Sequence, residues 1–285
     1  MQTALLIINY NDAETTITLL NQVKDYRAFD YIMVVDNNSS DDSLARLIAT
    51  YPNSRIEIVK SERNGGYGYA INFGCKYLSE KYGDLNVIVS NSDIVIKSNA
   101  DIERMIAYKA DDDGIVAPYI NEHGLISRGW KLPSPLVDTS LNLVYIHRFI
   151  KPKMMYYPQD YYDHRDWVYV EAILGCFFLI DTKMLRKVNY FDECVFLYAE
   201  ENIIGKKFKD AGIKTKVVCN VEVIHNHSVS IDKSINRINK YKQLKKSQYF
   251  FQKYYNHANI LERFLYKLTA FLTYLILLVY YGVKR

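Results

Sequence analysis

Four polar clusters in the first hundred residues carry side chains that can bind a polar or phosphorylated ligand. They are "NYND", "DNNSSDDS", "ERNGGYG" and "NSD", beginning at Asn9, Asp36, Glu62 and Asn91. Asp41 and Asp42 can simply cap a helix. The glycines of "NGG" permit a turn, and they also let backbone amides approach a phosphate. Asp93 ends an apolar run, so its carboxylate is either a turn residue or a group that holds a ligand.

The elements around these clusters are expected to bring them to one place. Short β-branched runs, typical of strands, alternate with helical segments. The expected strands are Leu5–Ile8, Tyr31–Val35, Ile56–Val59 and Val87–Ser90, and the helices are Glu14–Lys24, Ser43–Tyr51 and Tyr69–Tyr82. This alternation predicts a parallel, doubly wound α/β sheet. Ligands of such sheets bind beyond the carboxyl ends of the strands, where all four clusters lie.

Composition limits the class of protein. A chain of 285 residues fits one large α/β domain with an appendage, and a net charge of +4 is too small to indicate nucleic-acid binding. The lysine-rich segment 233–253 indicates a local anionic partner instead. The four cysteines are widely spaced, which favours a reducing compartment over disulfides or zinc. The N-terminal "MQTALLIINYND" is expected to be a first strand rather than a signal peptide.

The C-terminal segment Phe264–Val283 is apolar except for Lys267. Its twenty residues would just span a hydrocarbon core of roughly 30 Å at ~1.5 Å per residue. The preceding segment mixes lysines with aromatic residues, a composition typical of helices in an anionic membrane interface. An interfacial hairpin or oligomerising helices are slightly favoured over a spanning helix, and a helix packed on the core remains the alternative.

Taken together, the motifs "LLIINYN", "MVVDNNSSDDS", "RNGGYGYAINFG", "VSNSDIVI" and "FDECVFLYAEENIIGKKFKDAG" resemble, in this order, those of family 2 glycosyltransferases of the GT-A fold. The similarity is greatest to the bacterial rhamnosyltransferase-like branch and covers roughly Thr3 to Ser230. It implies a Rossmann-like mixed α/β sheet flanked by helices. Residues 1–98 would form the nucleotide-sugar half and 99–230 the acceptor half, with 231–285 as a helical, membrane-associating or oligomerising appendage.

The resemblance also implies a set of ligand-binding residues. The nucleotide sugar would contact Tyr10, Asn11, Asp36, Asn38, Arg63, Asn64, Gly65, Asn72, Asn91 and Ser92. Asp93 matches the last aspartate of the family's metal-binding motif, and Asn91 replaces the first. His225 would be a further metal or diphosphate contact, with His227 as the weaker candidate. The implied cofactor is Mn²⁺ or Mg²⁺, which take oxygen ligands from one or two carboxylates and substrate phosphates.

The general base implied by the resemblance is Glu201, with Glu200 beside it. An inverting transferase needs a carboxylate that takes the proton of the acceptor hydroxyl. Here Glu201 replaces the family's aspartate, and Ile203 replaces a further acid. As an alternative, two glutamates at a helix start also suit the helix dipole.

The resulting expectation is an enzyme that moves a sugar from a UDP- or dTDP-linked donor to a lipid-linked oligosaccharide of the bacterial cell surface. It would lie at the cytoplasmic face of the plasma membrane, peripheral or C-terminally anchored, as a possible homo-oligomer without nucleic acid. Two alternatives remain open. One is a catalytically degenerate partner that binds glycan or nucleotide, suggested by Asn91 and Ile203. The other is a nucleotidyltransferase, which would release pyrophosphate.

Overall fold

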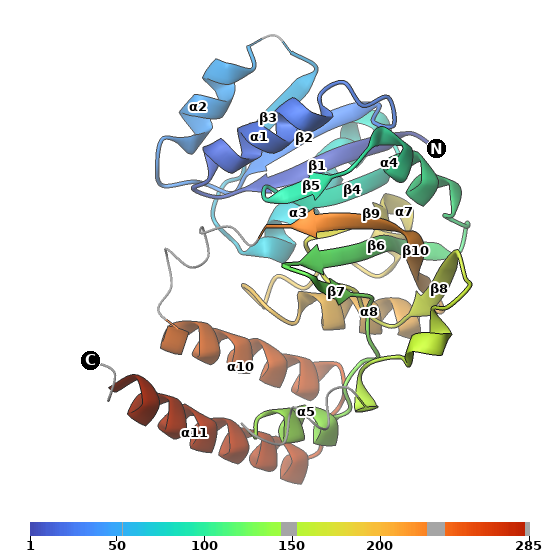
Figure 1. Cartoon of the computed structure of the whole chain (residues 1–285). Helices are drawn as coiled ribbons and strands as arrows, with labels where there is room; N and C mark the ends of the chain where they lie inside the picture. Colours follow the sequence, from blue (N-terminus) through green and yellow to red (C-terminus); the bar gives the residue numbers. More distant parts are fainter. Residues whose placement is uncertain (53, 144–152, 227–236, 283–285) are drawn as a thin grey trace.

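The computed structural model describes residues 1–52, 54–143, 153–226 and 237–282. Within them the chain forms a ten-stranded mixed sheet with helices on both faces and a helical pair near the C-terminus (Figure 1). The strand order is β3-β2-β1-β4-β9-β6-β10-β5, with β7 paired to β6 and β8 paired to β10.

The N-terminal half follows the predicted strand–helix alternation. Its strands are β1 (Thr3–Asn9), β2 (Tyr31–Asp36), β3 (Ile56–Lys60) and β4 (Asn86–Asn91), and its helices are α1 (Ala13–Val23), α2 (Ser43–Thr50) and α3 (Tyr67–Tyr82). These four strands are parallel neighbours. They are apolar on both sides because helices cover both faces of the sheet.

The second half makes the sheet mixed rather than wholly parallel, which corrects the parallel sheet expected from the alternation. Strand β9 (Phe177–Asp181) lies between β4 and β6 (Asp113–Glu122) and is antiparallel to both. Its five residues are all buried. A short apolar run of this kind fits a parallel or an antiparallel neighbour equally well, so its sequence does not fix its direction.

The remaining strands and helices complete the second half. The strands are β5 (Ile94–Ile96), β7 (Leu125–Ser127), β8 (Trp167–Val170) and β10 (Lys214–His225). The helices are α4 (Asn99–Ala107), α5 (Pro135–Leu141), the 3₁₀ turn η1 (Gln159–Tyr161), α7 (Thr182–Lys187) and α8 (Glu200–Asp210).

Two hydrophobic cores lie on opposite faces of the sheet. On β1, Leu6 belongs to the core that includes residues of α3 and α8, whereas Leu5 and Ile7 belong to the core that includes residues of α1 and α4. This is the two-residue alternation of a strand. The two cores fix the sheet between helical layers and leave its strand ends to carry polar groups.

The C-terminal helices α10 (Arg237–Tyr254) and α11 (Ile260–Gly282) lie beside α5 (Figure 1). Asn142, just after α5, donates to the carbonyl of Tyr266 and to the hydroxyl of Thr269. Phe251 of α10 is fully buried against Val195 and Ile203. The appendage therefore packs on the segments around α5 and α8. Within the described residues, α11 is the helix whose length and composition would allow it to cross a membrane, over Ile260–Tyr280.

Candidate active site

The carboxyl ends of the parallel strands meet at one edge, as predicted. Asn9 of β1 lies opposite Asp36 of β2, and Ile8 lies opposite Asn91 of β4. The polar clusters that follow these strands are therefore neighbours. This edge forms the floor of the candidate site.

Asp36 is fully buried and bound by the protein itself. Its carboxylate accepts hydrogen bonds from the Asn9 amide at 2.8 Å, from the Ser39 backbone at 2.9 Å and from the Ser39 hydroxyl at 2.6 Å. Asn11 joins the same loops, since its backbone N–H donates to Ser39 at 2.9 Å. Asp36 thus shapes the expected nucleotide pocket by holding two loops together.

Three more accessible members of this group lie beside that buried carboxylate, of which Tyr10 is exposed and Asn11 and Asn38 are half-buried. Asn38 has a φ of +58° and Asn11 a φ of +54°, a conformation that asparagine tolerates better than most residues. Tyr10 is exposed at the end of β1. Tyr10, Asn11 and Asn38 are therefore placed where a base or ribose could reach them.

The loop before α3 is fixed by asparagines. The side-chain oxygen of Asn64 accepts from the Gly66 backbone at 3.2 Å and from the Asn37 amide at 3.1 Å. The Asn37 amide also donates to the Gly66 carbonyl. Asn37 was not among the residues singled out from the sequence. Its position inside "DNNSS" was the available signal.

Gly65 and Gly66 of this loop have no room for a side chain. A Cβ at Gly65 would overlap the ring of Tyr69, and a Cβ at Gly66 would overlap the Phe196 carbonyl oxygen. The guanidinium of Arg63 lies 5.0 Å from the centre of the Tyr69 ring and 3.8 Å from Glu193. The two glycines therefore let this loop pack closely against Tyr69 and Phe196, and the ligand contact expected of Gly65 stays a prediction.

Asn72 lies inside the protein rather than along an open pocket. Its amide donates to the Phe191 carbonyl and to Glu193, and its oxygen accepts from the Phe191 backbone, each at 2.9 Å. These bonds occupy the side-chain amide of Asn72, which a contact with the diphosphate would need. Asn72 instead ties α3 to the segment that leads into α8.

Asp93 and His225 meet at the strand edge, as expected. The Nε2 atom of His225 lies 3.3 Å from the Asp93 carboxylate, and its Nδ1 atom lies 2.7 Å from Glu122. Burial opposes the charge of His225, but hydrogen bonds to Asp93 and Cys176 outweigh it and raise its pKa to about 11. Glu122 and Cys176 were not predicted from the sequence. They come from β6 and the start of β9, far away in the chain.

The donor set at this position fits a divalent cation only in part. Asp93 supplies carboxylate oxygen, an ordinary ligand of Mn²⁺. His225 can supply imidazole nitrogen only after it loses the proton that its raised pKa retains. Among the described residues, however, no group of three or more His, Cys, Asp or Glu side chains is arranged to hold a metal ion. Two protein ligands suffice for Mg²⁺ or Mn²⁺ only when substrate phosphates complete the shell.

Asn91 and Ser92 directly precede Asp93 of the Asp93–His225 pair. The Asn91 backbone donates to the Cys176 carbonyl at 2.8 Å, and the Ser92 hydroxyl lies 3.5 Å from Asp12. Both residues therefore lie at the expected edge. His227 lies outside the described residues.

Glu200 and Glu201 open α8. Burial raises the pKa of Glu200 well above its usual value, and repulsion from Glu201 raises it further. One oxygen of Glu200, Oε2, is buried without a hydrogen-bond partner in the part of the chain that is described. Burial also raises the pKa of Glu201, while backbone hydrogen bonds, including one from Gly175, oppose the shift. Two carboxylates with raised pKa values at a strand edge can accept and donate protons.

Tyr67 connects these carboxylates to the Asp93 side of the site. Its hydroxyl donates to the Gly175 carbonyl at 2.7 Å. Burial and the charges of Cys176, Glu200, Glu201 and Asp93 raise the pKa of Tyr67 well above its usual value. Tyr67 is therefore near the expected metal ligand and both expected acids. The sequence pointed to neither Tyr67 nor its hydrogen bond, because Gly175 is 108 residues away.

The segment before α8 is held in an unusual backbone conformation. Tyr198 and Ala199 have φ values of +68° and +66°. The Phe196 carbonyl accepts from the Tyr67 backbone, and the Leu197 carbonyl accepts from Ser247 of α10. The C-terminal helices thus help to place the residues that lead into Glu200.

Comparisons with known proteins identify the family of this chain. The family model described as "Glycosyl transferase family 2" matches residues 4–188. Proteins of two Mycobacterium tuberculosis strains, CDC 1551 and H37Rv, are 26% identical over 218 residues, which is 70% of this chain and 68% of theirs. Both are named N-acetylglucosaminyl-diphospho-decaprenol L-rhamnosyltransferase.

Solved structures show the same fold at low identity. GalNAc-T7, solved with UDP, GalNAc and Mn²⁺, matches with a TM-score of 0.59 and 14% identity over 80% of this chain. TarS of S. aureus matches with a TM-score of 0.53 and 15% identity over 90% of this chain. The chain spans 44% of the length of each of these two proteins. These likenesses confirm the expected GT-A architecture, and with the family match over most of its length the chain belongs to glycosyl transferase family 2.

Proposed function

We propose that this protein is an inverting glycosyltransferase that moves a sugar from a UDP- or dTDP-linked donor to a lipid-linked saccharide. The observation that carries the proposal is that Gly175 and Cys176 lie between the two groups. The Tyr67 hydroxyl donates to the Gly175 carbonyl at 2.7 Å, and Glu201 packs against Gly175. The Cys176 carbonyl accepts from the backbone of Asn91, two residues before Asp93, which itself lies 3.3 Å from His225. An acid–base group and a diphosphate-binding group on one strand edge are what glycosyl transfer from a nucleotide sugar requires. The proposal includes the lipid-linked saccharide as the acceptor and the inversion of configuration at the anomeric carbon.

In this mechanism Glu201 accepts the proton of the acceptor hydroxyl as its oxygen attacks the anomeric carbon. The nucleoside diphosphate leaves from the opposite face of the sugar, which inverts the configuration. The backbone of Gly175 donates to Glu201 and holds its carboxylate in place. Asp93 and His225 would hold the divalent cation, which neutralises charge on the leaving diphosphate when bound.

The nucleotide would lie across the loops that follow β1, β2 and β3. The loop of Asn64, Gly65 and Gly66 would lie along the diphosphate, and Arg63 adds a positive charge there. The N–H groups of Gly65 and Gly66 are bonded within the loop, to the Arg63 carbonyl and the Asn64 side chain, and hold its shape. Tyr10, Asn11 and Asn38 are available to the base and ribose. The protein contacts of Asp36 and Asn72 give these two residues a supporting role in the proposal.

Support for the substrates comes from the relatives. The GalNAc-T7 structure contains UDP and Mn²⁺, and the mycobacterial proteins are named for a decaprenol-linked substrate. A lipid-linked acceptor requires the enzyme to work close to a membrane. The C-terminal helices offer a surface for this.

Helix α11 exposes a row of large apolar side chains. Phe264, Phe271 and Val279 are 61%, 56% and 67% exposed. Cations lie beside this row, with Lys242 5.0 Å from the Tyr274 ring and Lys267 4.7 Å from the Tyr249 ring. An apolar row flanked by lysines fits the interface of an anionic membrane, the surface of a bacterial cytoplasmic leaflet. We therefore place the protein peripherally on that face, and we treat self-association as the competing outcome.

Calorimetric titration of the purified chain with UDP, with and without Mn²⁺, tests the donor site. We expect binding that requires Mn²⁺ and that Asp93→Ala weakens at least about tenfold, because the variant loses a direct ligand. The control is Asp111→Ala, which removes an exposed carboxylate just before the start of β6, at the end of that strand opposite Glu122. If both variants bind UDP with the same affinity, and Mn²⁺ does not change that affinity, the result would contradict the proposed donor site.

A further inference from the structure

The backbone that leads into Glu200 is strained. Tyr198 and Ala199 are consecutive residues with φ values of +68° and +66°, and neither is a glycine. A left-handed backbone costs free energy in a residue that has a side chain, and it persists only where the surrounding contacts hold it. The contacts that hold these two residues therefore also fix the direction in which Glu200 and Glu201 enter the site.

Residues 192–199, the pre-α8 segment, accept two hydrogen bonds from the C-terminal part of the chain. The hydroxyl of Ser247 on α10 donates to the Leu197 carbonyl at 2.7 Å. The hydroxyl of Tyr255, the residue after α10, donates to the Asp192 carboxylate at 2.6 Å. Ser247 is buried, so water does not compete for its bond. These bonds fix both ends of the pre-α8 segment to α10.

Phe251 adds an apolar contact to the two hydrogen bonds. It is four residues from Ser247 and from Tyr255, and it is fully buried in one cluster with Val195, Ala199 and Ile203. Ala199 is one of the two left-handed residues, and its carbonyl accepts from the backbone of Ile203 in the first turn of α8 at 2.9 Å. Helix α10 therefore supports the strained turn itself and the first turn of α8.

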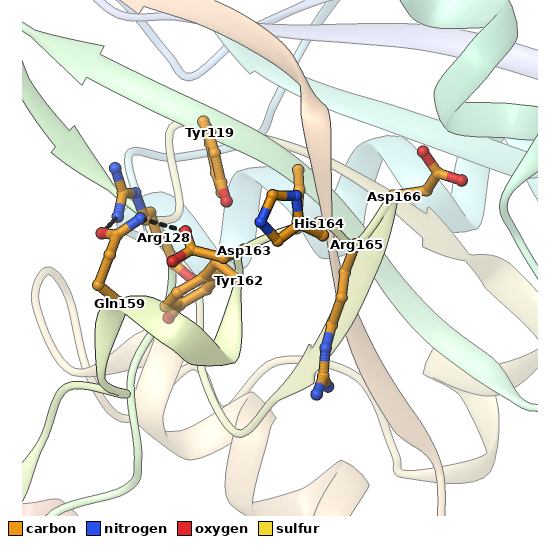
Figure 2. A pocket seen from close by; sticks show the side chains of 9 residues that line it. Tyr119, Arg128, Gln159, Tyr162, Asp163, His164, Arg165 and Asp166 are labelled. Carbon is orange, nitrogen blue, oxygen red and sulfur yellow. Dashed lines mark hydrogen bonds between the residues drawn. The ribbon is translucent and has the colours of Figure 1, made fainter.

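A second contact holds the start of α8 from the segment after β7. Figure 2 shows Arg128 beside Gln159, to which it donates, in the wall of an open cavity. Two residues after Arg128, the indole N–H of Trp130 donates to the side chain of Asn202 at 2.8 Å. The start of α8 is therefore fixed by Trp130 and, through the pre-α8 segment, by α10.

We infer that α10 positions the start of α8, with Ser247 and Tyr255 as positioning residues for Glu201. The two hydroxyls hold the strained turn that directs the Glu201 carboxylate against Gly175. A displacement of about 1 Å in a reacting group can lower the rate of reaction steeply. This role rests on the proposed function, because it takes Glu201 as the base, and it gives the C-terminal helices a part in the reaction besides membrane binding.

Hydrogen exchange of the full chain measures the positioning without any need for turnover. Ser247→Ala and Tyr255→Phe should each speed amide exchange over residues 198–204 about three- to tenfold, because each variant removes one hydrogen bond that opposes local opening. Tyr255→Phe keeps the ring and its packing, so it remains informative if Ser247→Ala does not fold.

The chain offers a matched control for each variant. Tyr241 is also on α10, but its hydroxyl donates to the Ala270 carbonyl of α11 at 2.9 Å, so Tyr241→Phe is the control for Tyr255→Phe. The hydroxyl of Ser140 donates to the Val137 carbonyl within α5 at 2.6 Å, so Ser140→Ala is the control for Ser247→Ala. Neither control should change exchange over residues 198–204.

Turnover of a nucleotide sugar by the same variants measures the consequence for the reaction. Ser247→Ala and Tyr255→Phe should each lower kcat about three- to tenfold and leave the Kd for UDP unchanged, because neither residue touches the donor loops. In a Glu201→Gln background neither substitution should lower the residual rate further, since both act through that carboxylate. A merely destabilising change would lower the rate in both backgrounds.

Unchanged exchange in Ser247→Ala and Tyr255→Phe, or equal acceleration in their controls, overturns the inference whatever the rates are. Faster exchange with a normal kcat, or the same loss of rate in the Glu201→Gln background, overturns the positioning of the base. If the wild type turns over no nucleotide sugar, the proposed function fails, and the exchange data alone then decide whether α10 holds the start of α8.

Discussion

At the scale of single residues, the carboxylates of this protein divide by what they touch. Asp36 is surrounded by donors from its own loops, whereas Glu200 has a buried oxygen without a hydrogen-bond partner in the described chain. Satisfied carboxylates stabilise a fold, and under-satisfied ones with raised pKa values are available for chemistry. This contrast places proton transfer at the start of α8 and does not choose between Glu200 and Glu201, and the family resemblance is the reason to propose Glu201 as the base.

Glu201→Gln should lower turnover by ~10²–10⁴-fold with little change in donor affinity, because the variant keeps the shape of the side chain but cannot accept a proton. The wild-type rate should rise with pH through a pKa above 4.5, because burial raises the pKa of Glu201 and the base must be ionised. Turnover of a nucleotide sugar across a pH series measures both effects.

Glu200→Gln is the internal control for this assay, and it should be much less impaired. If Glu200→Gln loses turnover and Glu201→Gln keeps it, the general base is Glu200 rather than Glu201. If the glutamates only stabilise the helix dipole, both variants should keep near-normal rates and lose about 1 kcal/mol of stability or less.

Gly66→Ala should destabilise the protein more than Gly83→Ala. Both glycines have backbone angles that other residues rarely adopt, with φ of +93° and ψ of −178° at Gly66 and φ of +82° and ψ of −166° at Gly83. That strain alone costs about 1–3 kcal/mol in either variant. Only at Gly66 would the new Cβ also overlap a carbonyl, that of Phe196, since nothing lies within 4 Å at Gly83. Urea unfolding measures the loss of unfolding free energy in each variant. Equal losses would contradict the close packing of the Gly66 loop against the Phe196 segment.

At the scale of elements, the sequence predicted the first four strands and their helices to within a few residues, because each carries its own local period. It also predicted that polar clusters gather at one strand edge. It could not predict β9 between β4 and β6, nor the bonds from Asn72 to Phe191 and Glu193. These depend on pairings between residues about 60 to 120 positions apart, which leave no periodic signal.

The contact between α5 and α10 should give stability a characteristic pH dependence. Burial raises the pKa of Asp138 to about 6, and burial lowers the pKa of Lys245 to about 8. The raised carboxyl pKa means that stability from Asp138 is complete below about pH 4 and is lost as pH rises through 6. The lowered amine pKa means that stability from Lys245 is complete above about pH 10.5 and is lost as pH falls through 8.

Urea unfolding from pH 4 to pH 10 measures this effect. Between pH 4 and pH 7 the wild type should lose up to about 3 kcal/mol relative to Asp138→Asn, since two pKa units correspond to that energy. Lys245→Met should remove the dependence between pH 8 and pH 10. Parallel curves for wild type and both variants would show that these groups are not buried in solution.

At the scale of the whole molecule, the C-terminal helices pack on the rest of the protein and also carry the proposed membrane surface. The sequence separated residues 231–285 as an appendage, but that boundary lies outside the described residues. Phe251, Ser247 and Tyr255 contact the segment before α8. Deleting α11 would therefore uncover packed residues, so substitutions on its exposed face test the membrane role better.

Replacing Phe264, Phe271 and Val279 together with serine should weaken binding to phosphatidylglycerol vesicles by roughly 10²-fold or more, because burial of each large apolar side chain contributes about 1.5–3 kcal/mol. Vesicle flotation measures this. Leu125→Ser on β7 is the control, since Leu125 is 77% exposed but lies outside the C-terminal helices. Unchanged flotation together with a smaller oligomer in sedimentation would assign the face to self-association.

Product analysis by ³¹P NMR tests the central claim most directly. The full chain is incubated with UDP- and dTDP-linked sugars, Mn²⁺ and an N-acetylglucosaminyl-diphospho-polyprenol as the acceptor, the class of substrate for which the mycobacterial relatives are named. It is incubated separately with the corresponding nucleoside triphosphates and sugar phosphates. A glycosyltransferase releases nucleoside diphosphate from one of the nucleotide sugars, and Glu201→Gln abolishes the release. Pyrophosphate formed from a triphosphate, or no turnover of any donor that calorimetry shows to bind, would contradict glycosyl transfer by this protein.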